Sequence, residues 1–593
     1  MLQIIKGRFY LPLIILILVA LSLALFIRYK WVSSRYPSPL DIPIQLAANF
    51  GELREDHFHM GLDIRTNGRE GLPVHSVADG YISHISIREN GLGKAIYITD
   101  PNGLVTVFAH LSLFTEDLEK FVHTRQYATQ SWEQDLDLPA GRYPVLREQL
   151  IAYSGNTGNS AAPHLHFEIR DSKTGRNLNP LLSGLHIPDN IPPVITGLYW
   201  YDRRYSTYST RAKKIALAGR DGHCHTIEQI VRVSSPVISL GISVTDKSAN
   251  SPHLSGIYHA ELWLDNTLIY AFSLRDIPDS DTRYVNACID YTKWVRSGIY
   301  VQHLSILPGN HLPIFTISGK DGTIQLGDAR VHNLHIVVED IYQNRSVLDL
   351  QMQYDSASET QAPDLPSNNQ QLQPGRENSI KGHYVRAYFD AAAFYDRAPF
   401  LLKEQGVSKV AQLTRKAGGD NNAIQASPLI QLGDPSIPVH DRFRVQLRTT
   451  LALDNPLRKK TIMQLVSGPC KMFVKGSWQG DWMSGYFIRL GAFQLIIDTT
   501  PPMIESLGWE DGQIFPPDAL TINLQCKDDL GSVPYFRAEM DGQWVPFARK
   551  ADHFMYLFDD HCAAGRHTLT VEVKDVAGNV TKRSFSFTRV DKS

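Results

Sequence analysis

The chain has 593 residues, more than one hydrophobic core usually organises, so two to four domains are expected. Its 59 basic and 61 acidic residues give a formal charge of −2, which argues against a nucleic-acid-binding protein that relies on overall positive charge. With 43% hydrophobic and 20% charged residues the composition is that of a globular protein, and five cysteines are too few for a disulfide scaffold.

The first distinctive stretch is an apolar segment near the N-terminus. Residues 9–27 carry no charge, and as a helix they are long enough to cross a hydrocarbon layer of about 30 Å. The basic residues before the segment favour a cytoplasmic location for residues 1–8. Basic residues also follow it, so the orientation rests partly on the exported function inferred below. A cleavable signal peptide is the alternative, but no Ala-x-Ala site follows, and we predict an uncleaved single-pass transmembrane anchor.

Residues 40–187 have the pattern of a β-rich domain. The runs 94–99 and 104–110 are separated by a turn that contains Asn102-Gly103, which predicts a β-hairpin. A charged insertion over about 114–144 interrupts the strand pattern, and we expect part of it to be helical.

Further along the chain, two segments share the same two short sequence motifs. Each begins with a Pro-Pro step before an apolar strand, at 192–193 and 501–502, and each later carries Asp-x-x-x-Asn, at 340–344 and 575–579. This repetition predicts two copies of one β-sandwich domain of immunoglobulin-like type, over residues 191–355 with insertions and over residues 498–593.

The part between the two copies divides at a change of composition. Residues 356–379 are rich in Ser, Gln, Asn and Pro and have few large apolar groups, so a flexible linker is predicted. Residues 380–497 are predicted to form another β-rich domain, whose type the sequence leaves open. Cys526 and Cys562 fall within one sandwich copy, where a disulfide and two buried free thiols are equally compatible with the sequence.

Two histidines near residue 165 are the first candidates for chemistry. Residues two apart in a strand point to the same face, so His164 and His166 project together while Leu165 and Phe167 face a core. Two adjacent imidazoles form a metal site or an acid–base site if a third group meets them.

His59 and Asp63 are candidates for the other half of that site. Gly61 between them favours an extended or looped conformation over a helix. One carboxylate and two imidazoles fit a zinc site with an open position, where the metal acts as a Lewis acid and lowers the pKa of water.

These pieces together resemble the lysostaphin-type (LytM-type) zinc metalloendopeptidases. The resemblance rests on His-x-Gly-x-Asp at 59–63, on a histidine that ends a strand, and on the phrases Ser-Gly-Asn-Thr-Gly at 154–158 and Pro-His-Leu-His-Phe-Glu at 163–168, and it covers about residues 48–185. Members of the family cut the peptide cross-links of peptidoglycan from a compact antiparallel β core. The resemblance therefore implies a mainly β fold, one Zn²⁺ per catalytic domain and peptidoglycan stem peptides as the substrate.

The resemblance also assigns roles to individual residues. Matched by position, His59, Asp63 and His166 would be the zinc ligands, and His110 and His164 would be catalytic groups beside the metal. Which of these two histidines is the general base is left open by the sequence.

The functional hypothesis is a zinc endopeptidase anchored in the inner membrane, with its catalytic and sandwich domains in the periplasm. Two alternatives stay open: a weakly active or inactive regulator of another cell-wall hydrolase, and a structural envelope protein that binds partners through its sandwich domains. No nucleic-acid partner is expected.

Overall fold

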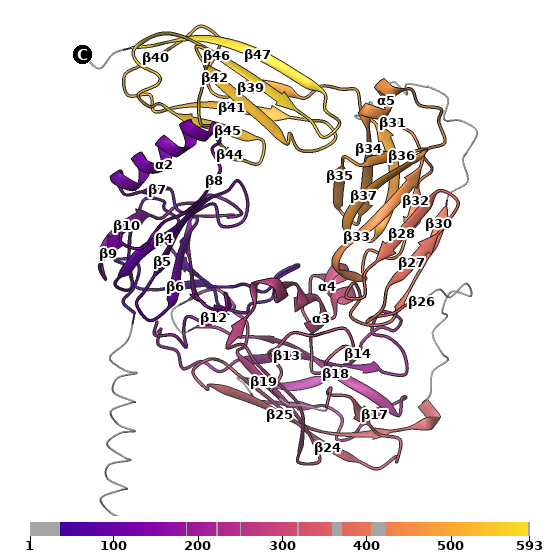
Figure 1. The fold of residues 1–593 in the computed structure, drawn as a ribbon. Coiled ribbons are helices and arrows are strands. Elements are labelled where there is room, and N and C mark those ends of the chain that lie inside the picture. Colours follow the sequence, from indigo (N-terminus) through magenta and orange to yellow (C-terminus); the bar gives the residue numbers. More distant parts are fainter. Residues whose placement is uncertain are drawn as a thin grey trace, which may run out of the picture.

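The computed structural model of the chain describes residues 36–185, 187–220, 223–248, 251–316, 320–358, 371–404 and 423–590. These residues form four successive β-rich domains (Figure 1), so the predicted mainly β fold is confirmed. The predicted cytoplasmic residues 1–8 and anchor 9–27 lie outside the described residues. Within the described ranges, no helix has the length and apolar character needed to cross a membrane.

The first domain is built on a mostly antiparallel sheet with a small three-stranded sheet beside it. In spatial order the main sheet contains β1 (Leu46–Ala48), β2 (Leu62–Arg65), β11 (His164–Asp171), β6 (Leu104–Ala109), β5 (Lys94–Thr99), β4 (Gly80–Ile87) and β8 (Gln134–Asp137), with β9 (Pro144–Val145) on β4 and β12 (Asn177–Leu178) on β11. The small sheet contains β3 (Pro73–His75), β10 (Leu150–Tyr153) and β7 (Leu113–Phe114).

Two local predictions for this domain are confirmed. Strands β5 and β6 form the expected hairpin, and the Asp100 carboxylate closes its turn by accepting hydrogen bonds from the backbone of Asn102 and Leu104 at 2.8 and 2.9 Å. The charged insertion contains helix α2 (Glu116–Thr129), whose acidic first turn suits the positive end of the helix dipole.

The second domain consists of two sheets. One contains β14 (Lys213–Ile215), β13 (Val194–Asp202), β18 (Val237–Thr245), β22 (Gln302–His303) and β23 (Ile324–Gln325). The other contains β15 (Leu217–Arg220), β16 (His223–Thr226), β25 (Arg345–Tyr354), β24 (His332–Glu339), β19 (His259–Leu264), β20 (Thr267–Ser273) and β17 (Val231–Val233). The remaining elements are β21 (Asp276–Ile277), η1 (Asp279–Tyr284), α3 (Val285–Cys288), α4 (Tyr291–Ser297) and η2 (Ser356–Ser358).

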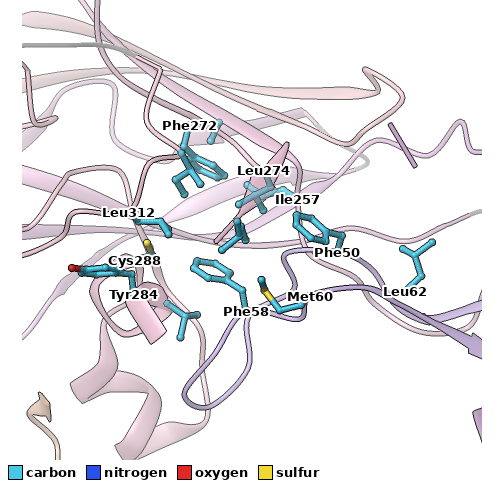
Figure 2. Packing of buried hydrophobic residues seen from close by; sticks show 14 of the residues in the cluster. Phe50, Phe58, Met60, Leu62, Ile257, Phe272, Leu274, Tyr284, Cys288 and Leu312 are labelled. Carbon is cyan, nitrogen blue, oxygen red and sulfur yellow. The ribbon is translucent and has the colours of Figure 1, made fainter. Parts of the chain in front are cut away.

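The first two domains share one hydrophobic core. A single cluster of buried residues runs from Leu40 to Met352 and also includes Tyr395 of the third domain, and β12 of the first domain pairs with β21 of the second. Figure 2 shows the seam, where Phe58 and Met60 of the first domain lie among second-domain residues that include Leu274. Because Phe58 and Met60 flank His59, the loop that carries this histidine is held by the second domain.

Replacing Phe58 with alanine should therefore affect both stability and the site. The ring is fully buried, so its loss should lower the free energy of unfolding by about 3–5 kcal/mol, measured by urea denaturation. We also expect weaker metal binding, because the cavity forms next to His59. Phe587→Ala is the control, since it empties a similar volume in the fourth domain. Equal metal affinity in both variants would contradict the role given to the seam.

The third domain also has two main sheets, and this is the region whose type the sequence left open. One sheet contains β27 (Asn378–Lys381), β28 (Val385–Phe389), β33 (Pro438–Arg448), β37 (Trp482–Arg489) and β36 (Ser477–Gln479). The other contains β30 (Leu402–Glu404), β32 (Ile430–Leu432), β38 (Gly491–Ile497), β34 (Thr461–Ser467), β35 (Cys470–Val474) and β31 (Ile424–Gln425). Outside them lie β26 (Gln371–Leu372), β29 (Ala398–Pro399) and α5 (Asn455–Lys460).

The predicted flexible linker 356–379 needs correction at its C-terminal end. Strand β26 and the start of β27 fall inside this range. They belong to the third domain, because Leu372 is buried in its core and Asn378 pairs with Phe389. Residues 359–370 of the predicted linker lie outside the described residues.

The fourth domain reproduces the strand pairing of the second. It contains β39 (Met503–Ser506), β41 (Thr521–Lys527), β45 (His553–Leu557) and β44 (Ala548–Lys550) in one sheet, and β40 (Gln513–Phe515), β47 (Val580–Arg589), β46 (Gly565–Lys574), β42 (Tyr535–Met540) and β43 (Gln543–Trp544) in the other. The first strand of each copy pairs in the same way, β13 with β18 and β39 with β41. The last strand of each copy has a parallel neighbour, β17 beside β25 and β40 beside β47. This shared pairing agrees with the predicted repeat. All five cysteines, which lie in the described ranges, are free thiols.

The fourth domain returns to the first, so that the four domains form a closed ring (Figure 1). Asp559 accepts a hydrogen bond of 2.7 Å from the hydroxyl of Tyr127 on α2, and the His561 ring stacks on Tyr127 with centroids 3.7 Å apart. Lys550 donates to the backbone oxygen of Asn156 at 2.7 Å. The predicted insertion is thus the surface on which the fourth domain docks.

Candidate metallopeptidase site

Three side chains from two neighbouring strands and a loop converge on one point. The Nε2 atom of His59 lies 3.0 Å from Oδ1 of Asp63 and 3.2 Å from Nδ1 of His166, and the last two atoms are 2.8 Å apart. Ligands held about 2.0–2.2 Å from a tetrahedral metal ion lie about 3.3–3.6 Å from one another. The three atoms therefore fit a metal ion after shifts of a few tenths of an ångström.

The backbone explains how these residues meet. Strands β2 and β11 pair antiparallel, so that His166 lies directly opposite Asp63. His59 precedes β2 in a loop, as Gly61 led us to expect, and does not lie on a helix with Asp63. A Cβ atom at Gly61 would lie 2.4 Å from the backbone oxygen of Phe167, so only glycine allows the loop to pass this close to β11.

The other ring nitrogens of the two candidate ligand histidines fix their tautomers. Nδ1 of His59 is 2.8 Å from the backbone oxygen of Asn49, and Nε2 of His166 is 2.8 Å from Oε1 of Glu168. A carbonyl oxygen only accepts hydrogen bonds, so His59 must carry its proton on Nδ1, which leaves a lone pair on Nε2. When His166 is neutral, the same logic at the Glu168 carboxylate leaves a lone pair on its Nδ1. Both lone pairs face Asp63, as metal ligation requires.

His110 and His164 lie beside this group. Their rings are 4.7 Å apart between centroids, and the His110 and His166 rings are 5.7 Å apart. Nδ1 of His110 is 2.8 Å from the backbone oxygen of Thr157, and Nδ1 of His164 is 2.9 Å from that of Ala162. Each neutral ring thus donates through Nδ1 and keeps Nε2 free of its proton. Either one could accept a proton at Nε2.

The backbone at His110 is unusual for a histidine. Its φ of 58° is in the left-handed region, and its N–H donates to the backbone oxygen of Leu92 at 2.9 Å. This conformation, directly after β6, turns the ring from the strand toward the site. Position 158, next to Thr157, also requires glycine. Its φ is +69°, and a Cβ atom there would lie 2.4 Å from the backbone nitrogen of Gly93.

The electrostatic environment separates the protonation states of these groups. Burial lowers the pKa of His110 to about 3, and the charges of His166 and His164 act in the same direction. Burial alone would also lower the pKa of His166, but hydrogen bonds to Asp63 and Glu168 raise it to about 9. Burial would raise the pKa of Asp63, yet the neighbouring charge of His59 and hydrogen bonds from the histidines hold it well below its usual range. The site thus has an ionised carboxylate that attracts a cation, a neutral His110, and a His166 ring that must give up one proton before its Nδ1 can bind a metal ion.

Three residues that the sequence did not assign a role also support the site. Asn49 and Glu168 hold the two ligand histidines as described, and Glu168 is itself paired with Arg170 at 2.6 Å. Arg54 forms ion pairs with Asp63 at 3.4 Å and with Glu52 at 3.2 Å. Glu168 was detectable, because it lies two residues after His166 on the same strand face.

The structure thus brings all five sequence-predicted residues together, namely His59, Asp63, His110, His164 and His166. The first, second and last of them form a group that could hold a metal ion. Their individual roles stay predictions.

Replacing Glu168 with glutamine should weaken metal binding without removing any ligand. The neutral amide holds the His166 imidazole less strongly and makes its Nδ1 a weaker electron-pair donor to the metal. We therefore expect a loss of about 10- to 100-fold in metal affinity, measured by competition with a chromophoric chelator. Glu261→Gln is the matched control, because Glu261 pairs with His259 on β19 in the second domain. Unchanged affinity in Glu168→Gln would show that the carboxylate does not support the metal.

Comparison with known proteins supports a LytM-type metallopeptidase, as the motifs indicate, although no family model matches the sequence. The DD-carboxypeptidase/endopeptidase Mpg of Neisseria meningitidis serogroup B is 30% identical over 131 residues, which is 22% of this chain and 24% of the relative. An uncharacterized metalloprotease of Haemophilus influenzae is 31% identical over 123 residues, which is 21% of this chain and 20% of the relative. The chain thus spans a quarter or less of the length of these relatives.

Solved structures give similarities of comparable extent. A zinc-containing peptidase from Vibrio cholerae is 24% identical and matches 26% of this chain and 41% of its own, with a TM-score of 0.20. The catalytic domain of lysostaphin from Staphylococcus simulans is 23% identical and matches 24% of this chain and 92% of its own, with a TM-score of 0.18.

Proposed function

We propose that this protein is a zinc-dependent endopeptidase that hydrolyses amide bonds in the peptide cross-links of peptidoglycan. The observation that carries the proposal is the convergence of His59, Asp63 and His166, whose lone pairs and charge face one point. The names of the relatives, which include an endopeptidase and a metalloprotease, support the same class of reaction.

His59, Asp63 and His166 would hold the zinc ion, which supplies a Lewis acid for the scissile carbonyl and lowers the pKa of water. The chain's own groups supply proton transfer. In His110 and His164 the backbone oxygen contact is at Nδ1, which leaves Nε2 for proton transfer, although Nε2 of His164 also lies 3.3 Å from Oδ1 of Asp63. One of the two rings takes the proton of the attacking water and returns it to the leaving amine. A neutral His110 suits this task, because its Nε2 carries no proton, whereas a ring protonated on both nitrogens could not act as a base.

The location of the protein is part of the proposal. The uncharged segment 9–27 would anchor it in the inner membrane, and residues 36–593 would lie in the periplasm, where the peptidoglycan substrate is found. Membrane fractionation with alkaline extraction tests the anchor: release of the chain into the soluble fraction would contradict it.

The proposed activity is tested with the full-length protein in detergent, loaded with zinc and incubated with cross-linked muropeptides. We expect mass spectrometry to detect the two uncrosslinked products, whose masses add up to the mass of the cross-linked muropeptide plus one water molecule. Intact muropeptides after incubation with metal-loaded protein would reject the proposal and favour a regulatory or structural role. The complete ligand group argues against that role, because inactive relatives of such enzymes usually lack ligands.

A further inference from the structure

A second group of carboxylates lies away from the candidate peptidase site, where the first domain meets the second. Asp189 is in the connection between the two domains, Asp246 directly follows β18, and Asp340 directly follows β24. One carboxylate oxygen from each lies within 4.8 Å of the other two. Asp246 and Asp340 are only 6% and 3% exposed.

The hydrogen bonds of this group are incomplete at one position. Asp340 accepts hydrogen bonds from the backbone of Tyr342 and Asn344 at 2.8 and 2.9 Å and from the Asn344 amide at 2.7 Å. In contrast, Oδ1 of Asp246 is buried and has no hydrogen-bond partner, while its other oxygen has a long contact of 3.4 Å with the Ser255 hydroxyl. A buried carboxylate oxygen without a partner is costly, so a ligand that is not part of the chain is expected here.

A cavity at the same place has room for that ligand. Its volume is about 30 Å³, which exceeds the roughly 10–15 Å³ that one water molecule requires. The three aspartates line it together with the oxygen-bearing side chains of Asn49, Ser248, Ser255, Tyr258 and Tyr342.

The charge of the group calls for a cation. Burial raises the pKa of Asp246 to about 7, and the charges of Asp340 and Asp189 act in the same direction. Burial raises the pKa of Asp340 as well. When all three carboxylates are ionised, they repel one another, and burial adds the cost of losing their hydration. A divalent cation bound between them would offset both the repulsion and the cost of burial.

We propose that Asp189, Asp246 and Asp340 form a structural binding site for a hard divalent cation of the Ca²⁺ class. Carboxylate and hydroxyl oxygens without histidine or cysteine select hard cations, and each of the three carboxylates offers one oxygen to a common point. Ca²⁺ accepts six to eight oxygen ligands in flexible geometry, whereas Mg²⁺ demands a near-ideal octahedron. The ion joins two strand ends of the second domain to the connection from the first.

The site also has a short path to the peptidase ligands. Asn49, which lines the cavity, bonds through its side chain to both backbone groups of Gly256 at 3.0 and 2.7 Å. Its backbone oxygen accepts from His59 at 2.8 Å. A cation that orders the segment around Ser255 thus also fixes the residue that holds His59.

The repeated domain provides a natural control. Asp528 directly follows β41 as Asp246 follows β18, and Asp498 lies five residues before β39 as Asp189 lies five before β13. In this copy lysines stand close by: Lys460 and Lys475 donate to the backbone oxygens of Gly578 and Ala577, next to Asp575. Burial raises the pKa of Asp498 to about 6 and that of Asp528 to about 7, and the charge of Lys460 opposes the rise at Asp498. Oδ1 of Asp528 is buried without a hydrogen-bond partner, as Oδ1 of Asp246 is, so the lysines are what distinguishes the two groups. Because Lys460 and Lys475 bring positive charge to the second group, we expect lysine charge, and not a divalent ion, to balance its carboxylates.

The test uses metal-stripped full-length protein reloaded with one equivalent of zinc. We expect 1 mM Ca²⁺, but not 1 mM Mg²⁺, to raise the midpoint of thermal unfolding by roughly 5 °C. Asp246→Asn should abolish this shift and weaken Ca²⁺ binding at least tenfold in calorimetry, whereas Asp528→Asn should leave both unchanged. Tb³⁺ gives a second readout, because Tyr258 and Tyr342 in the cavity wall should sensitise its luminescence and Ca²⁺ should quench it by displacement.

Three results would overturn the site: no Ca²⁺-dependent shift in the wild type, an undiminished shift in Asp246→Asn, or an equal loss in Asp528→Asn. If Asp246→Asn does not fold, Tb³⁺ luminescence of the wild type decides, since its absence rejects the site. Zinc content of Asp246→Asn should stay at one equivalent, so these outcomes are independent of the proposed peptidase activity.

Discussion

His166→Ala is expected to remove the bound metal and the hydrolytic activity together. The imidazole supplies one of the three converging ligand atoms, and its loss also leaves the buried Glu168 carboxylate with Arg170 as its remaining charged partner. Because residues that merely support a ligand are worth about 10- to 100-fold in metal affinity, the loss of a ligand should exceed 100-fold. Metal content by atomic emission and muropeptide cleavage by mass spectrometry measure the two effects on one sample.

His84→Ala is the matched control for this variant. His84 lies on β4 of the same sheet and pairs with Asp135 and Asp137 at the surface, far from the ligand group in the strand order. It should keep full metal content and activity. A His166→Ala protein that retains one equivalent of tightly bound zinc would refute the ligand assignment, whatever its activity.

The ligand group could be predicted from the sequence because each part of it follows from local rules. Residues two apart in a strand share a face, which places His164 and His166 together, and Gly61 favours an extended or looped backbone between His59 and Asp63. What brings the two halves together is the antiparallel pairing of β2 with β11, across about a hundred residues. No periodicity encodes that pairing, and here it was the resemblance to a known family that supplied it.

The supporting contacts were less accessible to sequence analysis. Glu168 follows from the same strand periodicity as His166, whereas Asn49 acts through its backbone oxygen, which every residue has. The ion pair of Arg54 with Asp63 depends on a distance of 3.4 Å, which composition and spacing do not determine.

The predicted domain organisation rested on repetition, which the sequence shows for the second and fourth domains. The two sandwich copies share their strand pairing, but the first and second domains join in one core that no boundary signal revealed. The signal was present in Phe58 and Met60, two large apolar residues that alternate with histidines in a loop. Apolar residues next to candidate ligands indicate that the loop is anchored, and here the anchor is a different domain.

The ring arrangement gives the remaining domains a role at the site. The fourth domain contacts the backbone of Asn156 through Lys550, and Arg549 pairs with Glu89 at 3.0 Å. Asn156 lies one residue before Thr157, whose oxygen orients His110. On the other side, Arg489 of the third domain pairs with Glu55 at 2.6 Å, four residues before His59. Loops on both sides of the ligand group are thus held by domains outside the peptidase region.

His110→Ala should separate catalysis from metal binding. The His110 ring makes no hydrogen bond to the three candidate ligand atoms, and its ring hydrogen bond is to the Thr157 oxygen, so its removal should leave the metal in place. Loss of a positioned proton acceptor typically costs 10²- to 10⁴-fold, and we expect kcat to fall by about this factor at saturating zinc with little change in KM.

The same variant distinguishes the two candidate bases. If His110 is the general base, His110→Ala shows the larger fall in kcat and loses the acidic limb of the pH–rate profile, while His164→Ala retains that limb. His164 lies 3.3 Å from Asp63, so its removal should also alter metal affinity, which removal of His110 should not. Loss of zinc from His110→Ala would reverse this assignment and place His110 among the ligands, because the neutral Nε2 that makes it a base is also what a metal ion would bind.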